Sequence, residues 1–163
     1  MTLSELNEME QAPFVKALGW VFEHSPWVAE RVWTSKPFSS SKELHGAMVA
    51  VVDGASNMEQ LALIRAHPDL GTKAKMSNAS VGEQIGAGLD QLSAGEFEAL
   101  HGLTAAYREK FGFPFIYAVK GASKQQILSA LEVRLLNEKE AERTMALQQI
   151  AQIAWFRLSG EIL

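Results

Sequence analysis

The sequence predicts an all-α protein, folded as a single-domain bundle of about seven or eight helices over residues 1–163. Three observations predict this fold class. Apolar residues recur at helical spacing through most of the chain, and helix-capping patterns stand before these stretches. The length of 163 residues, with 47% apolar side chains, is sufficient for one domain with a hydrophobic core.

Prolines and capping patterns mark the expected helix starts. Pro13 can occupy the first turn of one helix, and Ser25 followed by Pro26 marks the start of another. In a capping box, two residues three positions apart each bond the backbone of the other. Such pairs predict five further starts, at Ser40–Glu43, Asn57–Gln60, Ser80–Glu83, Ser93–Glu96 and Ser123–Gln126.

Other residues predict where helices end. Because a residue before proline is pushed out of the helical region, Pro68 places a helix end near Ala66. Gly112 is expected to end the helix that starts after Ser93, and the last helix should begin after Asn137. Residues 112–120 are continuously apolar around a proline, with neither helical spacing nor alternation. We therefore expect one extended, buried segment between two helices.

The composition and the absence of several known motifs argue against some classes of function. A net charge of -4 and the lack of a basic run argue against a nucleic-acid partner. The chain has no cysteine, which removes disulfides and thiolate chemistry and fits a reducing compartment. No H-E-x-x-H zinc pattern, phosphate-binding loop or G-x-S-x-G nucleophile motif occurs. We expect no metal and no cofactor.

The expected location is the cytoplasm. No stretch approaches the roughly 20 apolar residues that span a membrane. The first residues, "MTLSELNEMEQ", do not resemble a secretory signal, and the last, "GEIL", carry no peroxisomal tripeptide. A protein without membrane partners is the expectation.

Three polar residues are candidates for chemistry, and each has a plainer alternative. His67 lies at a predicted helix end, where a protonated imidazole can simply interact with the helix dipole. Glu83 can act as the capping partner of Ser80. Arg157 borders the apolar stripe of the last helix. It either extends its stem over the core toward water or is a buried guanidinium that binds an anion.

Six motifs, in this order, connect these candidates to a known family. They are "FEHSPWVAERVW", "HPDLGTKA", "SVGEQ", "YREKFGFPFI", "RLLNEKEAE" and "IAWFRL". Together they resemble the 2-oxo-4-hydroxy-4-carboxy-5-ureidoimidazoline (OHCU) decarboxylases of purine catabolism, over nearly the whole chain. The resemblance implies an all-α homodimer that needs no cofactor and converts the ureidoimidazoline to (S)-allantoin and CO₂. It also implies a functional link to urate oxidase and 5-hydroxyisourate hydrolase.

The resemblance assigns roles to individual residues. It implies that His67, Glu83 and Arg157 are catalytic. The implied substrate-binding residues are Pro68, Ser80, Gln84, Phe115, Ile116, Tyr117 and Ala118. Two alternatives stay open. One is another ureide-processing lyase or isomerase on the same helical scaffold, and the other is a helical interaction module without enzymatic activity.

Overall fold

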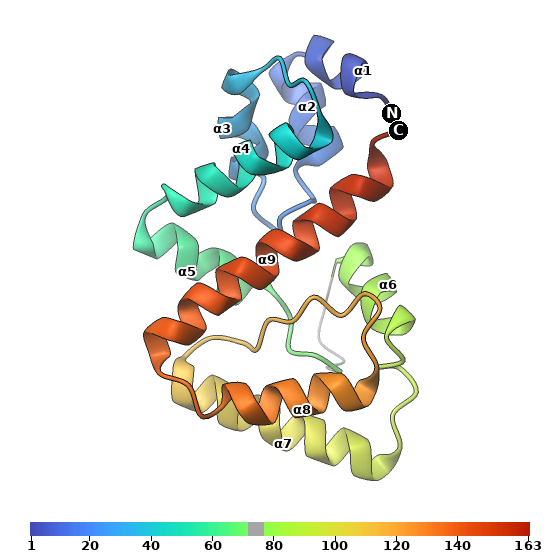
Figure 1. The fold of residues 1–163 in the computed structure, drawn as a ribbon, viewed down its shortest axis with the longest axis vertical. Coiled ribbons are helices and arrows are strands. Elements are labelled where there is room, and N and C mark those ends of the chain that lie inside the picture. The colour runs from blue at the N-terminus through green and yellow to red at the C-terminus, as the bar shows by residue number, and fades with distance from the viewer. Residues whose placement is uncertain (72–76) are drawn as a thin grey trace. The chain divides into compact units, whose positions relative to one another are not determined.

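The computed structural model describes residues 1–71 and 77–163 (Figure 1). Within these residues it has nine α-helices, one 3-10 helix and no strand, which confirms the predicted all-α class. The helices outnumber the expected seven or eight partly because α1 (Leu3–Glu8) stands on its own. A capping box between Thr2 and Glu5 starts this short helix. The described chain divides into two compact units, residues 1–66 with 151–163, and residues 67–150.

The first unit is built from five helices at the N-terminal side and the end of the last helix. Its elements are α1, α2 (Gln11–Leu18), α3 (Trp27–Val32), the 3-10 helix η1 (Trp33–Ser35), α4 (Ser41–Asp53), α5 (Asn57–Ala66) and the final turns of α9 (Lys139–Glu161). Helix α3 packs against both α2 and α4. Phe14, Leu18, Val28, Leu44 and Met48 are buried among these helices and form the core of the unit.

The second unit contains α6 (Asn78–Gly86), α7 (Ala94–Phe111), α8 (Lys124–Arg134) and the first turns of α9. Helices α7 and α8 lie side by side, and the chain between them runs back along the pair without helical turns (Figure 1). Its core is aromatic, with Tyr107, Phe111, Phe113 and Phe115 all nearly inaccessible to solvent. The buried segment expected near residues 112–120 is therefore present.

Several predicted helix ends are confirmed. Capping boxes are complete at Ser93–Glu96, before α7, and at Ser123–Gln126, before α8. Helix α7 ends at Phe111, and Gly112 follows in the left-handed region with φ 77°. Helix α5 ends at Ala66. Each of these helix ends could be predicted because the residues that form it are close neighbours in the sequence.

Two predicted capping boxes are wrong. Helix α6 is capped by Ser77, whose side chain accepts the backbone N–H of Ser80 at 3.2 Å, so Ser80 lies inside the helix. Before α5, the reciprocal bonds join Ser56 and Glu59 instead of Asn57 and Gln60. In both cases a serine earlier in the chain offers the hydroxyl that starts the helix.

Two further starts are partly as predicted. Ser40 accepts the N–H of Glu43 as expected, but the Glu43 carboxylate bonds Ser39. Helix α3 begins at Trp27, one residue after Pro26.

Candidate active site

His67 lies where the chain leaves α5 and enters the second unit. Pro68 excludes the helical conformation for the residue before it, so α5 stops at Ala66. Only 6% of His67 is exposed, so the imidazole is in the protein interior. Histidine is the side chain whose unperturbed pKa lies nearest neutrality, so an imidazole at this position is suited to moving protons.

Helix α6 carries three of the predicted site residues. Ser80 and Gln84 are buried, and Glu83 is half-buried. Residues three and four positions apart share one side of a helix, so Glu83 and Gln84 lie on the same side as Ser80. Because Ser80 is not the cap of α6, the reading of Glu83 as the partner in a capping box with Ser80 is wrong. The structure thus places all three in the same unit as His67.

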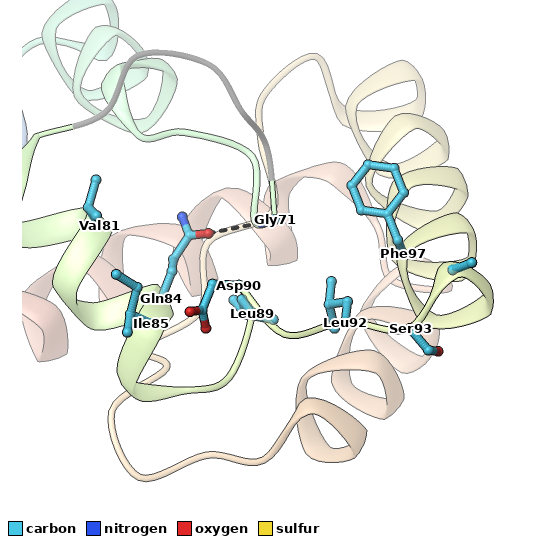
Figure 2. Close-up of a pocket in the computed structure, with 10 residues that line it drawn as sticks. Gly71, Val81, Gln84, Ile85, Leu89, Asp90, Leu92, Ser93 and Phe97 are labelled. Atoms are coloured by element: carbon cyan, nitrogen blue, oxygen red, sulfur yellow. Dashed lines mark hydrogen bonds between the residues drawn. The ribbon is translucent and has the colours of Figure 1, made fainter.

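Gln84 connects α6 to the residues that follow His67. Its Oε1 atom accepts the backbone N–H of Gly71 at 2.9 Å (Figure 2). Gly71 has φ +71°, and a Cβ atom at this position would lie 2.7 Å from Cδ2 of Leu100. Both the backbone conformation and the lack of space require glycine here. The motif "HPDLGTKA" continues into residues 72–74, which lie outside the described part of the chain.

Residues Phe115, Ile116 and Ala118 are buried, and Tyr117 is half-buried. All four belong to the second unit, with His67 and α6. The phenyl ring of Phe115 stacks on the Tyr117 ring at a centroid distance of 5.9 Å. The segment that the resemblance assigns to the substrate is therefore packed in a defined conformation.

Arg157 belongs to the first unit, on the last turns of α9. Its side chain is 4% exposed, so the stem does not carry the charge out to water. Nη2 donates to Oε2 of Glu23 at 2.9 Å, and Nη1 donates to the carbonyl oxygens of Trp20 and Val21 at 3.3 Å each. Of the two readings of Arg157, the structure supports the buried guanidinium.

A cavity of about 580 Å³ lies between α6 and the start of α7 in the second unit. Figure 2 shows Val81, Ile85 and Phe97 around it, and Gln84 is the one predicted site residue in its lining. Asp90 is the single titratable side chain among the described residues that line it. An apolar cavity of this kind has few groups for acid–base chemistry, so it does not replace His67 as the candidate centre.

Neither a metal centre nor a membrane-spanning helix is present among the described residues. No group of three or more His, Asp or Glu side chains in residues 1–71 and 77–163 is arranged to hold a metal ion. Within the same residues, no helix is long and apolar enough to cross a membrane.

Comparison with known proteins decides the family. The family model described as OHCU decarboxylase matches residues 7–159. The chain belongs to the OHCU decarboxylase family. This confirms the resemblance, and with it the expected enzyme class, a carboxy-lyase.

Several members of the OHCU decarboxylase family are similar along the whole chain. The 2-oxo-4-hydroxy-4-carboxy-5-ureidoimidazoline decarboxylase of Haloferax volcanii is 45% identical over 98% of this chain and 95% of its own length. The uric acid degradation bifunctional protein PucL of Bacillus subtilis is 48% identical over 99% of this chain. This chain corresponds to 33% of that longer protein.

Solved structures of related proteins agree with the fold. The crystal structure of (S)-allantoin synthase matches 99% of this chain and 54% of its own, with a TM-score of 0.83 and 34% identity. The crystal structure of OHCU decarboxylase in the presence of (S)-allantoin matches 82% of this chain and 89% of its own. Its TM-score is 0.69 at 26% identity.

A buried polar cluster in the second unit was not predicted from the sequence. Arg134 and Glu142 form an ion pair at 2.8 Å with side chains 8% and 0% exposed. The Tyr107 hydroxyl donates to Glu142 Oε1 at 2.5 Å. Burial, and then this hydrogen bond, raise the pKa of Tyr107 well above its usual value. The motif "RLLNEKEAE" begins with Arg134 and ends with Glu142. Their spacing of eight residues across a helix break was the one sequence feature that could have indicated this pair.

Glu23, the partner of Arg157, was also missed. It lies in "FEHSPW", between α2 and α3, and its side chain is 0% exposed. An acidic residue in a short connection is usually a solvated one, so nothing local marked it. Its pairing with Arg157, a residue 134 positions away, accounts for the burial of this carboxylate.

Proposed function

We propose that this protein is a cofactor-independent OHCU decarboxylase, which converts 2-oxo-4-hydroxy-4-carboxy-5-ureidoimidazoline to (S)-allantoin and CO₂ in urate degradation. The observation that carries the proposal is that the family model matches nearly the full chain. The decarboxylase of Haloferax volcanii is also matched over almost its whole length. The match at residues 7–159 spans both compact units, so we also propose that they act as one domain.

The substrate's own structure explains how the reaction can proceed without a cofactor. Its carboxyl-bearing carbon neighbours a ring carbon that is doubly bonded to nitrogen. When the bond to CO₂ breaks, the electron pair moves into this imine, the nitrogen takes up a proton, and an enamine-type intermediate results. The hydroxyl-bearing carbon then becomes the ring carbonyl, and the neighbouring carbon is protonated. The protein has to orient the ring and move protons at the correct face.

We assign these tasks to three residues, His67, Glu83 and Arg157. His67 is the main acid–base group, because it is buried and its unperturbed pKa is near neutral. Glu83 orients His67 or the substrate, or shares the proton transfer. Arg157 binds substrate oxygens, a role suited to a buried guanidinium, because its planar set of donors matches oxygen acceptors.

Substrate binding is proposed for a second group of residues. Buried Ser80 and Gln84 supply polar side chains from α6, and half-buried Pro68 lies beside His67. The backbone of residues 115–118 supplies N–H and C=O groups. These proposals rest on the family motifs and on the presence of all these residues in the second unit.

We also propose a functional link to other enzymes, an oligomeric state and a cellular location for this enzyme. Bifunctional uric acid degradation proteins contain a region similar to this chain, which supports a link with urate oxidase and 5-hydroxyisourate hydrolase. We propose a homodimer in the cytoplasm that acts on a small molecule, without nucleic acid or membrane as a partner. Sedimentation of the purified protein and fractionation of cells would test these two points.

The chirality of the allantoin that is formed tests the function. Urate, urate oxidase and 5-hydroxyisourate hydrolase generate the ureidoimidazoline in solution, and circular dichroism follows the product. We expect an excess of (S)-allantoin and release of CO₂ when this protein is added, against a racemic product without it. Dialysis against a strong chelator should leave the rate unchanged. Racemic product in both samples would refute the function, and activity that returns only with added metal would refute cofactor independence.

A further inference from the structure

Residues 113–118 are mostly buried and belong to no helix, and no strand lies beside them among the described residues. Phe113 and Phe115 both contact the ring of Tyr107, at centroid distances of 6.1 and 5.4 Å, and Phe115 stacks on Tyr117. Side chains two residues apart that share a face are typical of an extended chain. Buried backbone N–H and C=O groups need partners, and within the described residues no strand supplies them.

Two side chains supply partners instead. Nη1 of Arg134 donates to the carbonyl oxygen of Ile116 at 2.5 Å, and the N–H of Ala118 donates to Oε1 of Gln149 at 2.9 Å. In an extended chain, residues two apart present their polar groups to the same edge. Both bonds therefore hold one edge, and the N–H and C=O of Tyr117 point to the other.

Arg134 is itself held in a fixed orientation. Its Nε donates to Oε1 of Glu142 at 2.8 Å, and its guanidinium lies over the Phe115 ring at 4.4 Å. Glu142 also accepts hydrogen bonds from Tyr107 at 2.5 Å and from Asn137 at 2.9 Å. A buried ion pair is seldom more stabilising than well-packed apolar residues. The bond to Ile116 gives this pair a purpose that apolar residues could not fulfil.

We propose that Arg134 and Gln149 are positioning residues for the decarboxylation. They hold one polar edge of residues 115–118 so that the opposite edge faces the substrate. The inference rests on the proposed function, in which these four residues line the substrate site. Neither side chain has to touch the substrate. Loss of either bond lets the segment shift, which weakens binding of the substrate and of the transition state alike.

Variants at Gln149 test the inference with a matched control. Gln149→Leu removes the acceptor at similar size, whereas Gln149→Glu keeps an oxygen at the same place. Gln148→Leu makes the same change at the neighbouring, exposed position of α9. For each full-length variant we would measure kcat, KM, the enantiomeric excess of the product and the melting temperature, with substrate generated from urate.

We expect Gln149→Leu to raise KM roughly 3- to 10-fold, the range for one lost hydrogen bond, with kcat within about twofold of the parent. Gln149→Glu should restore KM, and Gln148→Leu should not change it. Arg134→Lys keeps a charge beside Glu142 but loses the planar fork that reaches Ile116. It should raise KM in the same way, even where the melting temperature falls.

Each variant decides the role of its own residue. A parental KM in Gln149→Leu or Arg134→Lys, whatever its melting temperature, would overturn the role of that residue. An equal rise of KM in Gln149→Glu would show that the lost acceptor is not the cause. If the parent and Gln148→Leu formed no excess of (S)-allantoin, the proposed function would fail and the inference with it. An active parent beside unaffected Gln149→Leu and Arg134→Lys variants would overturn the inference and leave the proposed function standing.

Discussion

Arg134 and Arg157 are buried arginines that interact with the backbone in the same manner. Each pairs with a glutamate whose side chain is 0% exposed, Glu142 for the first and Glu23 for the second. Each also donates from Nη1 to carbonyl oxygens in segments outside the helices. The five donors of a guanidinium, in a fixed plane, make this division possible. Each residue therefore neutralises a buried carboxylate and orients a loop at once.

Removal of one partner of such a pair should be costly. We expect Glu142→Ala to lower the free energy of unfolding by about 3–5 kcal/mol, because Arg134 is left charged and uncompensated in the interior. Urea denaturation at neutral pH measures this. Glu140→Ala, at an exposed position in the first turn of α9, is the control and should change the free energy by less than about 1 kcal/mol. A loss below about 1 kcal/mol in Glu142→Ala would mean that solvent reaches Arg134.

Replacement of His67 should affect activity much more than stability. We expect His67→Asn to abolish stereospecific turnover, so that the ureidoimidazoline decays at its uncatalysed rate to racemic allantoin. Asparagine tolerates a helix end, so the stability loss should be about 0.5–2 kcal/mol, the range for a lost cap. Circular dichroism gives the fold and the product chirality. His101→Asn, at an exposed position of α7, is the control. Excess (S)-allantoin at the parental rate in His67→Asn would make Glu83 the leading acid–base candidate.

Among the elements, two of the connections that contain a glycine in the left-handed region can be compared directly. Gly71 lies between α5 and α6, with φ +71°, and Gly121 lies before α8, with φ +79°. A Cβ atom at Gly121 would meet nothing within 4 Å, whereas one at Gly71 would lie 2.7 Å from the buried Leu100 side chain. The two positions thus share a backbone conformation and differ in packing.

Alanine at these two glycines should separate strain from packing. We expect Gly121→Ala to cost about 1–2 kcal/mol, the strain of a left-handed residue that has a Cβ atom. Gly71→Ala should cost a further 1–3 kcal/mol or so, because Leu100 has to move within a packed core. Urea denaturation of both variants gives the difference. Equal losses would mean that Leu100 adjusts freely and that packing near Gly71 is loose.

At the scale of the whole molecule, several carboxylates are more acidic than usual. The Arg31 guanidinium, and then the Ser56 backbone N–H, lower the pKa of Glu59 from 4.5 to about 2. Capping bonds lower the pKa of Glu5 and Glu96, in each case mainly through the backbone N–H of the residue that caps the helix. These bonds stabilise the folded state only while the carboxylates are ionised.

Stability should therefore fall at acid pH in a defined window. A lowered pKa in the folded state gives stability that is present above about pH 4.5 and is lost as pH falls toward 2. The urea midpoint of the parent should decline across this window. Glu59→Gln should be less stable than the parent at pH 7, and the difference should vanish as pH approaches 2. Glu132→Gln, exposed on α8, should show the parental decline. A constant difference for Glu59→Gln would contradict the assignment to Arg31.

Most helix starts and ends, the helical class and the family can be predicted from the amino-acid sequence. Helix caps bond residues only a few positions away, so their sequence patterns are sufficient to predict them. Examples are the capping boxes Ser93–Glu96 and Ser123–Gln126 and the helix end at Gly112. Where two serines compete, as at Ser77 and Ser80, the local pattern permits either start. The candidate residues were identified from motifs that occur in a fixed order along the chain, and such an order can be recognised without a structure.

The burial and the hydrogen-bond partners of Arg134 and Arg157 could not be predicted from the sequence and depend on the folded chain. Arg157 is paired with Glu23, 134 positions away, and Arg134 bonds the carbonyl of Ile116, 18 positions away. An arginine at the edge of an apolar stripe has the same sequence pattern whether it extends to water or is buried. Its free energy depends on whether a carboxylate and carbonyl oxygens lie within hydrogen-bonding distance, and only the folded chain brings them there.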